Sequence, residues 1–382
     1  MTEQASATPR VYNLQLFEPA LVSGRLLDLF RRRGRSCSTA TEPVAITRQG
    51  PTSMETNGNA SATAPASTQI QVVEGIPISG FYDESVLRAA LRYEPGDDEV
   101  YVAAYPKSGT TWVHFLARRV LHQGRESPAE SAVQCMLSSI IGYTGSDTPN
   151  AVIKTHLPFG KTPFSEKARY IYVLRNPYDC CVSYYHQRMR LAHAPAISFD
   201  KFLDEFIEGD VPFGDYFDHL AAWFPQTSRP NVICVPYEQL KTDVRSGILR
   251  IADFLGTEYG NALRNDDEAL EEIIQTTSPN AMRKHYTEAK AAVLSSSNDK
   301  KKAEVAAAFV SRGLQKPAAG ASSEEKANLF KLVRKATVGD WRNHFSAAQA
   351  ERMKSNMESK MASKMAEHRD AVLALWKDLS LP

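Results

Sequence analysis

The fold of this chain is decided by one stretch, YPKSGTTW at residues 105–112. The residues that lead into it, 99–105, are mostly apolar, as in a buried strand. The residues after it, 110–122, repeat apolar side chains at helical spacing. The stretch is therefore predicted to be a tight turn that leads from a strand directly into a helix.

The composition of this turn suits an anion. Gly109 can adopt backbone angles that other residues avoid, and the first N–H groups of a helix have no partner within it. Lys107 and the hydroxyls of Ser108, Thr110 and Thr111 add further donors. The usual phosphate loop, G-x-x-x-x-G-K-[ST], places its Lys after the second Gly, whereas here the Lys precedes the Gly. The turn is thus P-loop-like without matching that motif, and a plain Ser/Thr helix cap is the alternative.

Outward from this turn, strands and helices alternate along the chain. Their apolar, β-branched strands are typical of a parallel sheet that is covered on both faces. We therefore expect an α/β protein, a single domain with a central parallel sheet flanked by helices. The predicted strands are 151–155, 169–174 and 231–235, and the predicted helices are 178–191, 199–208 and 238–255.

Polar residues follow two of these strands. Lys154 and His156 end one strand, and Arg175 closes another, ahead of a helix that carries Ser183. Strand ends in an open parallel sheet face the ligand crevice, where His can take a proton and Arg can bind phosphate with two hydrogen bonds. The alternatives are a structural histidine, an Arg175–Asp179 ion pair and an ordinary polar serine on a helix.

A basic pair, Arg334 and Lys335, precedes a Gly-containing turn near the C-terminus. A solvated loop is the usual meaning of such a pair. Over the whole chain of 382 residues, 45 Lys and Arg balance 44 Asp and Glu, so no global field favours nucleic acid. Any anion site must be local.

Other features of the sequence concern location and organisation. It contains no run of 18 apolar residues, which argues against a transmembrane segment, and its five cysteines have no metal-ligand spacing. We expect a cytoplasmic protein with reduced thiols. Residues 1–70 are predicted to be a disordered or weakly structured extension, in which 14–33 could alternatively be a targeting segment, and 71–382 to be the domain, with a low-complexity insertion at about 284–328.

Four motifs in this order resemble the cytosolic sulfotransferase family. They are YPKSGTTW at 105–112, KTHLP at 154–158, RNP followed by SYY between 175 and 185, and RKATVGDW at 334–341. The likeness extends over roughly 72–382. It implies a single α/β domain, 3′-phosphoadenosine 5′-phosphosulfate (PAPS) as co-substrate, a small-molecule hydroxyl acceptor and direct in-line transfer without a metal.

The resemblance also implies roles for individual residues. His156 would deprotonate the acceptor with Lys154 as a neighbouring helper, and Lys107 and Ser183 would join them as catalytic residues. The residues that would bind the nucleotide fall into three groups: Lys107, Ser108, Gly109, Thr110 and Thr111 for the 5′-phosphosulfate, Trp112, Tyr237 and Thr277 for the nucleoside, and Arg175, Ser183, Arg334 and Lys335 for the 3′-phosphate.

The chain departs from the family pattern in several places. Pro279 replaces an aromatic residue near the adenine, Ala336 replaces a glycine beside the 3′-phosphate, and Leu332-Val333 replaces a Phe-Met pair. The family's dimer motif survives only as Arg342, Ser346, Ala347 and Glu351, so monomer and homodimer both remain open. Two other functions follow from these departures or from the turn itself: a catalytically impaired nucleotide-binding homologue, and a nucleotide kinase-like enzyme.

The acceptor is indicated only by composition. The segment 135–150 and Phe159 would line its pocket, and they are rich in apolar and aromatic side chains. Such walls favour a lipophilic or phenolic acceptor over a polysaccharide.

Overall fold

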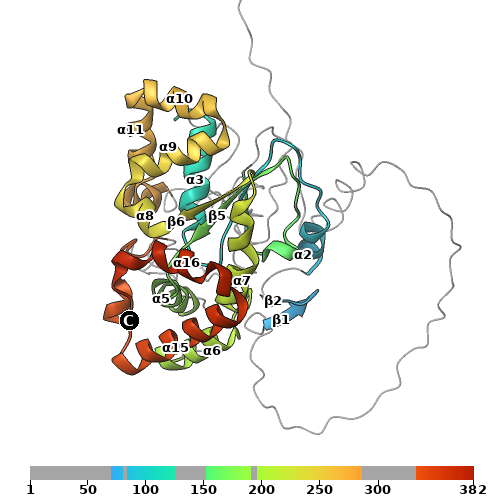
Figure 1. Cartoon of the computed structure of the whole chain (residues 1–382), viewed down its shortest axis with the longest axis vertical. Helices are drawn as coiled ribbons and strands as arrows, with labels where there is room; N and C mark the ends of the chain where they lie inside the picture. Colours follow the sequence, from blue (N-terminus) through green and yellow to red (C-terminus); the bar gives the residue numbers. More distant parts are fainter. Residues whose placement is uncertain (1–69, 81–83, 125–151, 191–195, 286–332) are drawn as a thin grey trace, which may run out of the picture.

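A four-stranded parallel sheet forms the centre of the molecule (Figure 1). The computed structural model describes residues 70–80, 84–124, 152–190, 196–285 and 333–382. The strand order is β4-β3-β5-β6, with Val100 of β3 opposite both Val152 of β4 and Arg169 of β5. The strands are β3 (Val100–Ala103), β4 (Val152–Thr155), β5 (Arg169–Leu174) and β6 (Val232–Pro236).

Alternation along the strands divides the core into two halves. Tyr101 and Tyr172 point into one half, and Val102 and Val173 point into the other. The aromatic half is packed by ring contacts, such as Tyr172 stacked on Trp223 at 5.6 Å. Both faces of the sheet are therefore buried, as the continuous apolar strands predicted.

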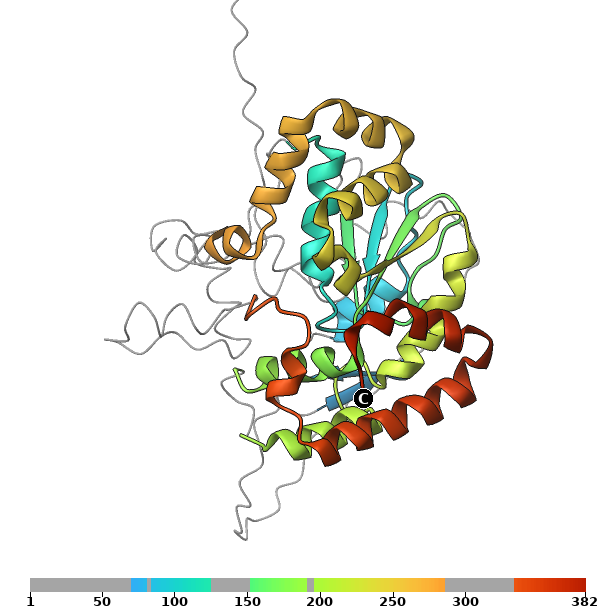
Figure 2. The same cartoon turned by 60° about the vertical axis from the view of Figure 1, so that its left-hand side comes forward.

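Helices cover the two faces (Figures 1 and 2). The aliphatic face carries α3 (Thr110–Leu121), α9 (Val244–Leu255), α10 (Thr257–Asn265) and α11 (Asp267–Thr276). The aromatic face carries α5 (Pro177–Arg188), α6 (Phe199–Glu208), α7 (Tyr216–Trp223), α15 (Ala347–Lys364) and α16 (Arg369–Leu375). Short 3-10 turns lie at η2 (Phe159–Lys161), η3 (Phe224–Ser228), η4 (Asp340–Asn343), η5 (Ala366–His368) and η6 (Lys377–Leu379).

A small antiparallel sheet precedes the central one. It pairs β1 (Ile70–Val73) with β2 (Ile76–Ser79) and is followed by α2 (Glu84–Leu91). Ile78 of β2 is fully buried in a separate core cluster that also contains Leu157 and Phe213. This hairpin thus supports the segment that follows β4.

The predicted fold class is confirmed, and most predicted elements lie within a few residues of their expected bounds. One expectation was wrong: residues 238–255 are not a single helix. The chain breaks at Asp243, whose φ of −133° is not helical, and its side chain caps α9 by accepting a hydrogen bond from the Ser246 N–H. The result is a short α8 (Tyr237–Thr242) followed by α9.

Several predictions fall outside the described residues. They concern the extension before residue 70, the acceptor segment at 135–150, Leu332 and nearly all of the insertion at about 284–328. Within the described part, no helix is long and apolar enough to cross a bilayer. Cys180 and Cys181 are buried free thiols, and Cys234 is a partly buried one.

Candidate functional site

The turn between β3 and α3 has the backbone of an anion-binding loop. Lys107 and Gly109 both have positive φ, 73° and 104°. A Cβ atom at Gly109 would lie 2.6 Å from Cδ2 of Tyr237, so only glycine fits this position. No side chain of the described residues caps α3, whose first N–H groups are therefore available to a ligand. The alternative of an ordinary Ser/Thr cap is wrong.

Arg175 fastens this turn to the neighbouring strand. Its Nη1 donates to the Lys107 carbonyl oxygen at 3.0 Å, and its guanidinium lies 4.5 Å from the centre of the Tyr237 ring. Its Nε is buried without a hydrogen-bond partner among the described residues. Trp112 contacts the Tyr237 ring edge-on, with the ring centres 5.6 Å apart. The structure thus brings four predicted nucleotide-binding residues, Gly109, Trp112, Arg175 and Tyr237, into one cluster.

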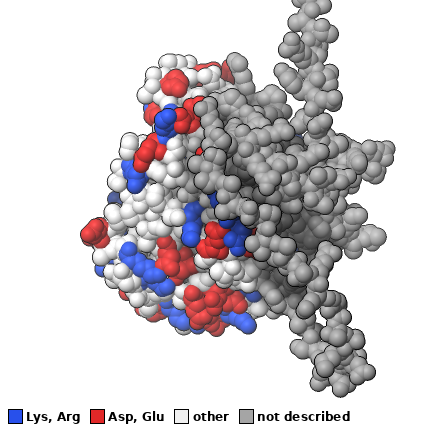
Figure 3. Space-filling view, turned by 90° about the vertical axis from the view of Figure 1, so that its right-hand side faces the viewer, with Lys and Arg blue, Asp and Glu red and all other residues white. Residues whose placement is uncertain are grey.

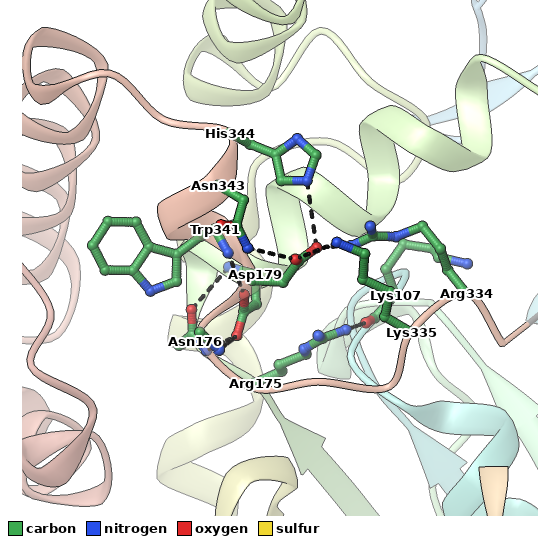
Figure 4. Close-up of polar contacts among 11 residues, drawn as sticks. Lys107, Arg175, Asn176, Asp179, Arg334, Lys335, Trp341, Asn343 and His344 are labelled. Atoms are coloured by element: carbon green, nitrogen blue, oxygen red, sulfur yellow. Dashed lines mark hydrogen bonds and ion pairs between the residues drawn. The ribbon is translucent and has the colours of Figure 1, made fainter.

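The alternative in which Arg175 pairs with Asp179 is wrong, because Asp179 binds another segment. Its carboxylate accepts hydrogen bonds from the N–H of Gly339 at 2.7 Å and of Trp341 at 3.0 Å (Figure 4). It also accepts from Nδ2 of Asn176 at 3.0 Å. The carboxylate is buried, and both of its oxygens accept hydrogen bonds. It joins the first turn of α5 to the C-terminal turn η4.

This anchor holds the predicted basic pair beside the loop. Figure 4 shows Arg334 and Lys335 on the same side of the site as Lys107. Both cations bind Asp340: Lys335 Nζ lies 2.8 Å from Oδ1, and Arg334 donates to Oδ2. Burial alone would raise the pKa of Asp340, but hydrogen bonds from Lys335, Arg334 and Asn343 outweigh it and lower that pKa. Arg334, whose side chain is 20% exposed, does not fit the solvated-loop alternative, whereas the Lys335 side chain remains 52% exposed.

Lys107 lies in a strongly positive environment. Burial lowers the pKa of its ammonium group to about 8, and the charges of Arg190, Arg175 and Arg334 act in the same direction. An anion that binds between cations that repel one another is stabilised by all of them at once. The electrostatics therefore favour a ligand with several negative charges at this point of an otherwise balanced chain.

His156 lies at the same edge of the sheet. Its Nδ1 is 2.7 Å from the Ala104 carbonyl oxygen, which can only accept, so Nδ1 carries the proton and Nε2 is left as the acceptor. Burial lowers the pKa of His156 to about 4, despite the opposing hydrogen bond to Ala104, and the charges of Lys154 and Lys107 lower it further. The imidazole is therefore neutral at physiological pH and able to take a proton.

Comparison with known proteins identifies the family of this chain. Residues 97–317, more than half of the chain, match the family model of the sulfotransferase domain. The chain belongs to the sulfotransferase family. It is 30% identical to human sulfotransferase 2A1 over 302 residues, covering 76% of this chain and 94% of that protein. It is 27% identical to rabbit sulfotransferase 1C2 over 316 residues, covering 78% and 95%.

Solved structures agree on the fold. Mouse sulfotransferase SULT7A1, crystallised in complex with PAP, is similar with a TM-score of 0.56 and 23% identity, covering 81% of this chain and 98% of that one. Retinol dehydratase in complex with androsterone and inactive cofactor PAP gives a TM-score of 0.53 at 18% identity, covering 75% and 87%.

The remaining predicted residues of this sulfotransferase lie in the loop itself and on other elements. Ser108 and Thr110 are buried and Thr111 is half-buried in the loop, Lys154 is buried in β4, and Ser183 lies half-buried on α5. Thr277 follows α11, and its hydroxyl donates to the Ile273 carbonyl oxygen at 2.7 Å. Among the described residues, no side-chain hydrogen bond joins Thr277 to the cluster. Phe159 packs on Trp223 with ring centres 5.3 Å apart.

The departures from the family pattern have structural counterparts. Ala336 has a φ of 56°, the left-handed conformation that a glycine adopts without strain. Pro279 opens a further helical segment, which Ser278 caps through the Ala281 N–H. Arg342 Nη2 donates to the carbonyl oxygens of Leu379 and Ser380 and so holds the C-terminal segment.

Sequence reasoning missed Asp179 and Asp340 as parts of the site. Asp179 resembles an ordinary acidic residue in a first helical turn, and two of its partners, Gly339 and Trp341, lie 160 and 162 positions away, so no local pattern reveals these contacts. Asp340 stands inside the motif at 334–341, five residues after Lys335. An acidic residue so close to a basic pair was the one available signal for an internal ion pair.

Proposed function

We propose that this sulfotransferase transfers a sulfonate group from PAPS to a hydroxyl of a small acceptor. The acceptor oxygen attacks sulfur and forms the new S–O bond, while the bond from sulfur to the bridging phosphate oxygen breaks and the electron pair leaves with adenosine 3′,5′-bisphosphate. The acceptor proton passes to His156. The reaction needs neither a covalent intermediate nor a metal.

The observation that carries this proposal is the pairing of a cationic loop with a neutral base at one sheet edge. His156 is tied by Nδ1 to Ala104, only three residues before Lys107. The loop N–H groups and Lys107 would stabilise the charge that grows on the bridging oxygen, a contribution that is large in sites of this kind. Lys154 helps to keep the imidazole neutral.

The nucleotide would lie across the cluster around Tyr237. The 5′-phosphosulfate would occupy the loop 107–111, with the nucleoside against Trp112, Tyr237 and Thr277. Arg175, Ser183, Arg334 and Lys335 would hold the 3′-phosphate. The buried, unpartnered Nε of Arg175 supports this placement, because a buried donor without a partner is costly until a ligand supplies one. A lipophilic or phenolic alcohol is the acceptor we propose.

A turnover assay with PAPS and a library of phenols and aliphatic alcohols tests the reaction. Release of adenosine 3′,5′-bisphosphate together with a sulfated acceptor is the expected result. Tight nucleotide binding with no turnover on any acceptor would instead indicate the impaired homologue. Loss of turnover upon addition of a chelator would indicate phosphoryl-transfer chemistry.

His156→Ala tests the assigned base. We expect it to retain affinity for the nucleotide while turnover falls by about two to four orders of magnitude. The deficit should be larger for an aliphatic alcohol than for an acidic phenol, which needs less help to ionise. Weakened nucleotide binding with unchanged turnover at saturation would make His156 a structural residue.

A further inference from the structure

Two histidines that the proposed reaction does not use lie near Asp340, the residue that binds the basic pair. His186 on α5 and His344 after η4 contact each other edge-on, with ring centres 4.9 Å apart. The Nε2 atoms of both rings are buried and have no hydrogen-bond partner among the described residues. His344 Nε2 lies 3.4 Å from Oδ2 of Asp340, close enough for an ion pair if the ring is protonated.

Asp340 is the group that connects these rings to the 3′-phosphate site. Its carboxylate binds Arg334, Lys335 and Nδ2 of Asn343, the last at 3.0 Å. Only 5% of its side chain is exposed, so it depends on these partners for its charged form. The two cations proposed to hold the 3′-phosphate therefore also neutralise an internal anion.

A bound 3′-phosphate would compete with Asp340 for the same cations. Up to two negative charges would be added beside a buried carboxylate, and Arg334 and Lys335 would have to serve both. A carboxylate deprived of cations in a buried place raises the pKa of a neighbouring imidazole. His344 is the imidazole that faces Asp340 most directly.

We propose that His344 takes up a proton when the 3′-phosphate binds, and that the imidazolium then neutralises Asp340. The inference rests on the proposed function, because it requires a 3′-phosphate at Arg334 and Lys335. It adds a proton-binding residue to the site: His344 touches no part of the nucleotide and acts through Asp340.

Most charged groups on the helices next to His344 already have partners. On α5, Arg188 is paired with Glu205 of α6, and on α15, Arg352 is paired with Asp200 and Asp204 of α6. Arg190, two residues after the end of α5, is a further cation near the basic pair.

His186 is the less suitable of the two imidazoles. Burial lowers the pKa of His186 to about 4, and the charges of Arg334, His344 and Arg190 lower it further against the opposing effect of Asp340. His186 therefore stays neutral and serves as the matched control.

The proposal predicts the sign of a linkage. A proton bound together with the ligand makes affinity rise as pH falls. The 3′-phosphate itself has a second pKa near about 6 and, on binding to cations, loses a proton, which has the opposite sign. The contribution of His344 is therefore the difference between the unaltered protein and a variant that lacks this imidazole.

The experiment measures proton uptake on binding of adenosine 3′,5′-bisphosphate to the full chain. Calorimetric titrations at pH 7 in two buffers with different heats of ionisation give the number of protons taken up. We compare the unaltered protein with His344→Gln and His186→Gln, and repeat each titration with adenosine 5′-phosphate. Asp340→Asn provides a second route to the same result if His344→Gln folds poorly, as judged by its Tm.

We expect the unaltered protein and His186→Gln to take up a larger fraction of a proton than His344→Gln and Asp340→Asn. Between pH 6.5 and 7.5, the Kd of the unaltered protein should rise about threefold more than that of His344→Gln. With adenosine 5′-phosphate the difference should vanish. Equal uptake in His344→Gln, or uptake lost only in His186→Gln, would overturn the inference while leaving the proposed function intact. Failure of the unaltered protein to bind the bisphosphate would overturn both.

Discussion

At the scale of single residues, Lys107 combines a special backbone with a perturbed side chain. Its φ of 73° lies in the left-handed region, which is costly for a lysine and is retained because Arg175 holds its carbonyl oxygen. The same arginine helps to lower the pKa of Lys107 to about 8. The protonated form, which the proposed transfer requires, is therefore lost as pH rises through about 8.

This pKa predicts an alkaline limit to activity. With an aliphatic alcohol as acceptor, kcat/KM for PAPS should fall above about pH 8, because kcat/KM reports the free enzyme. In Lys107→Arg the fall should move beyond about pH 10, since arginine stays charged, although the maximum will be lower. Lys107→Met should reduce turnover by about two to three orders of magnitude at every pH. An identical alkaline limb in the unaltered protein and Lys107→Arg would show that another group titrates.

Ala336 is the second residue whose backbone predicts a measurable effect. A left-handed alanine costs about 1 kcal/mol or more relative to glycine. Ala336→Gly should therefore raise the free energy of unfolding by about 1 kcal/mol in urea titrations. The exposed Ala362, inside α15, is the control: Ala362→Gly should lower it by about 0.5–1 kcal/mol. A loss of stability in Ala336→Gly would mean that other contacts of this loop favour alanine.

At the scale of elements, the sequence predicted those helices and strands whose bounds depend on neighbouring residues alone. The bounds of β5 and α6 follow from an apolar run and from clear helical spacing, and both were predicted to the residue. The break at Asp243 was missed because a capping aspartate between two helical patterns does not interrupt the apolar periodicity. Long-range anchors such as Asp179 leave no periodic trace at all.

Asp179 provides the prediction at this scale. Asp179→Asn removes the charge that holds the Gly339 and Trp341 N–H groups, and hydrogen bonds to charged groups contribute about 1.5–3 kcal/mol each. We expect a clear loss in the free energy of unfolding and weaker binding of adenosine 3′,5′-bisphosphate. Adenosine 5′-phosphate should lose less affinity, because η4 positions only the 3′-phosphate residues. Asp97→Asn, which breaks the exposed pair with Lys167, should change neither stability nor binding noticeably.

At the scale of the whole molecule, the balanced charge of the sequence has a visible counterpart. On the face shown in Figure 3, basic and acidic side chains are interspersed over the described residues without a broad patch of one sign. Positive charge is instead concentrated around Lys107, Arg175, Arg190 and Arg334. Three of these residues, Lys107, Arg175 and Arg334, fall in the sequence motifs at 105–112, 175–185 and 334–341, whereas Arg190 lies in none of them. The sequence did not reveal that His186 and His344 contact each other next to Asp340, since that arrangement depends on the docking of η4 against α5.

The last prediction concerns where the folded molecule begins. The extension before residue 70 was predicted to be dispensable because its composition lacks a core-forming pattern, and a chain starting at residue 70 should keep its Tm and its turnover. A chain starting at residue 80 should lose both. It removes Val73, Ile76 and Ile78, whose side chains are at most 3% exposed and each contribute about 1.5–3 kcal/mol, a sum comparable to the stability of a domain.

Loss of the hairpin should also displace His156. The Phe213 N–H donates to the Pro77 carbonyl oxygen at 2.6 Å, and the Phe213 ring packs edge-on against His156. Ile78→Ala in the full chain tests this link without a truncation, and should cost about 2–5 kcal/mol and lower turnover more than nucleotide affinity. Two results would contradict the prediction: a drop in soluble yield for the chain that starts at residue 70, which would mean that the extension packs on the domain, or full turnover from the chain that starts at residue 80.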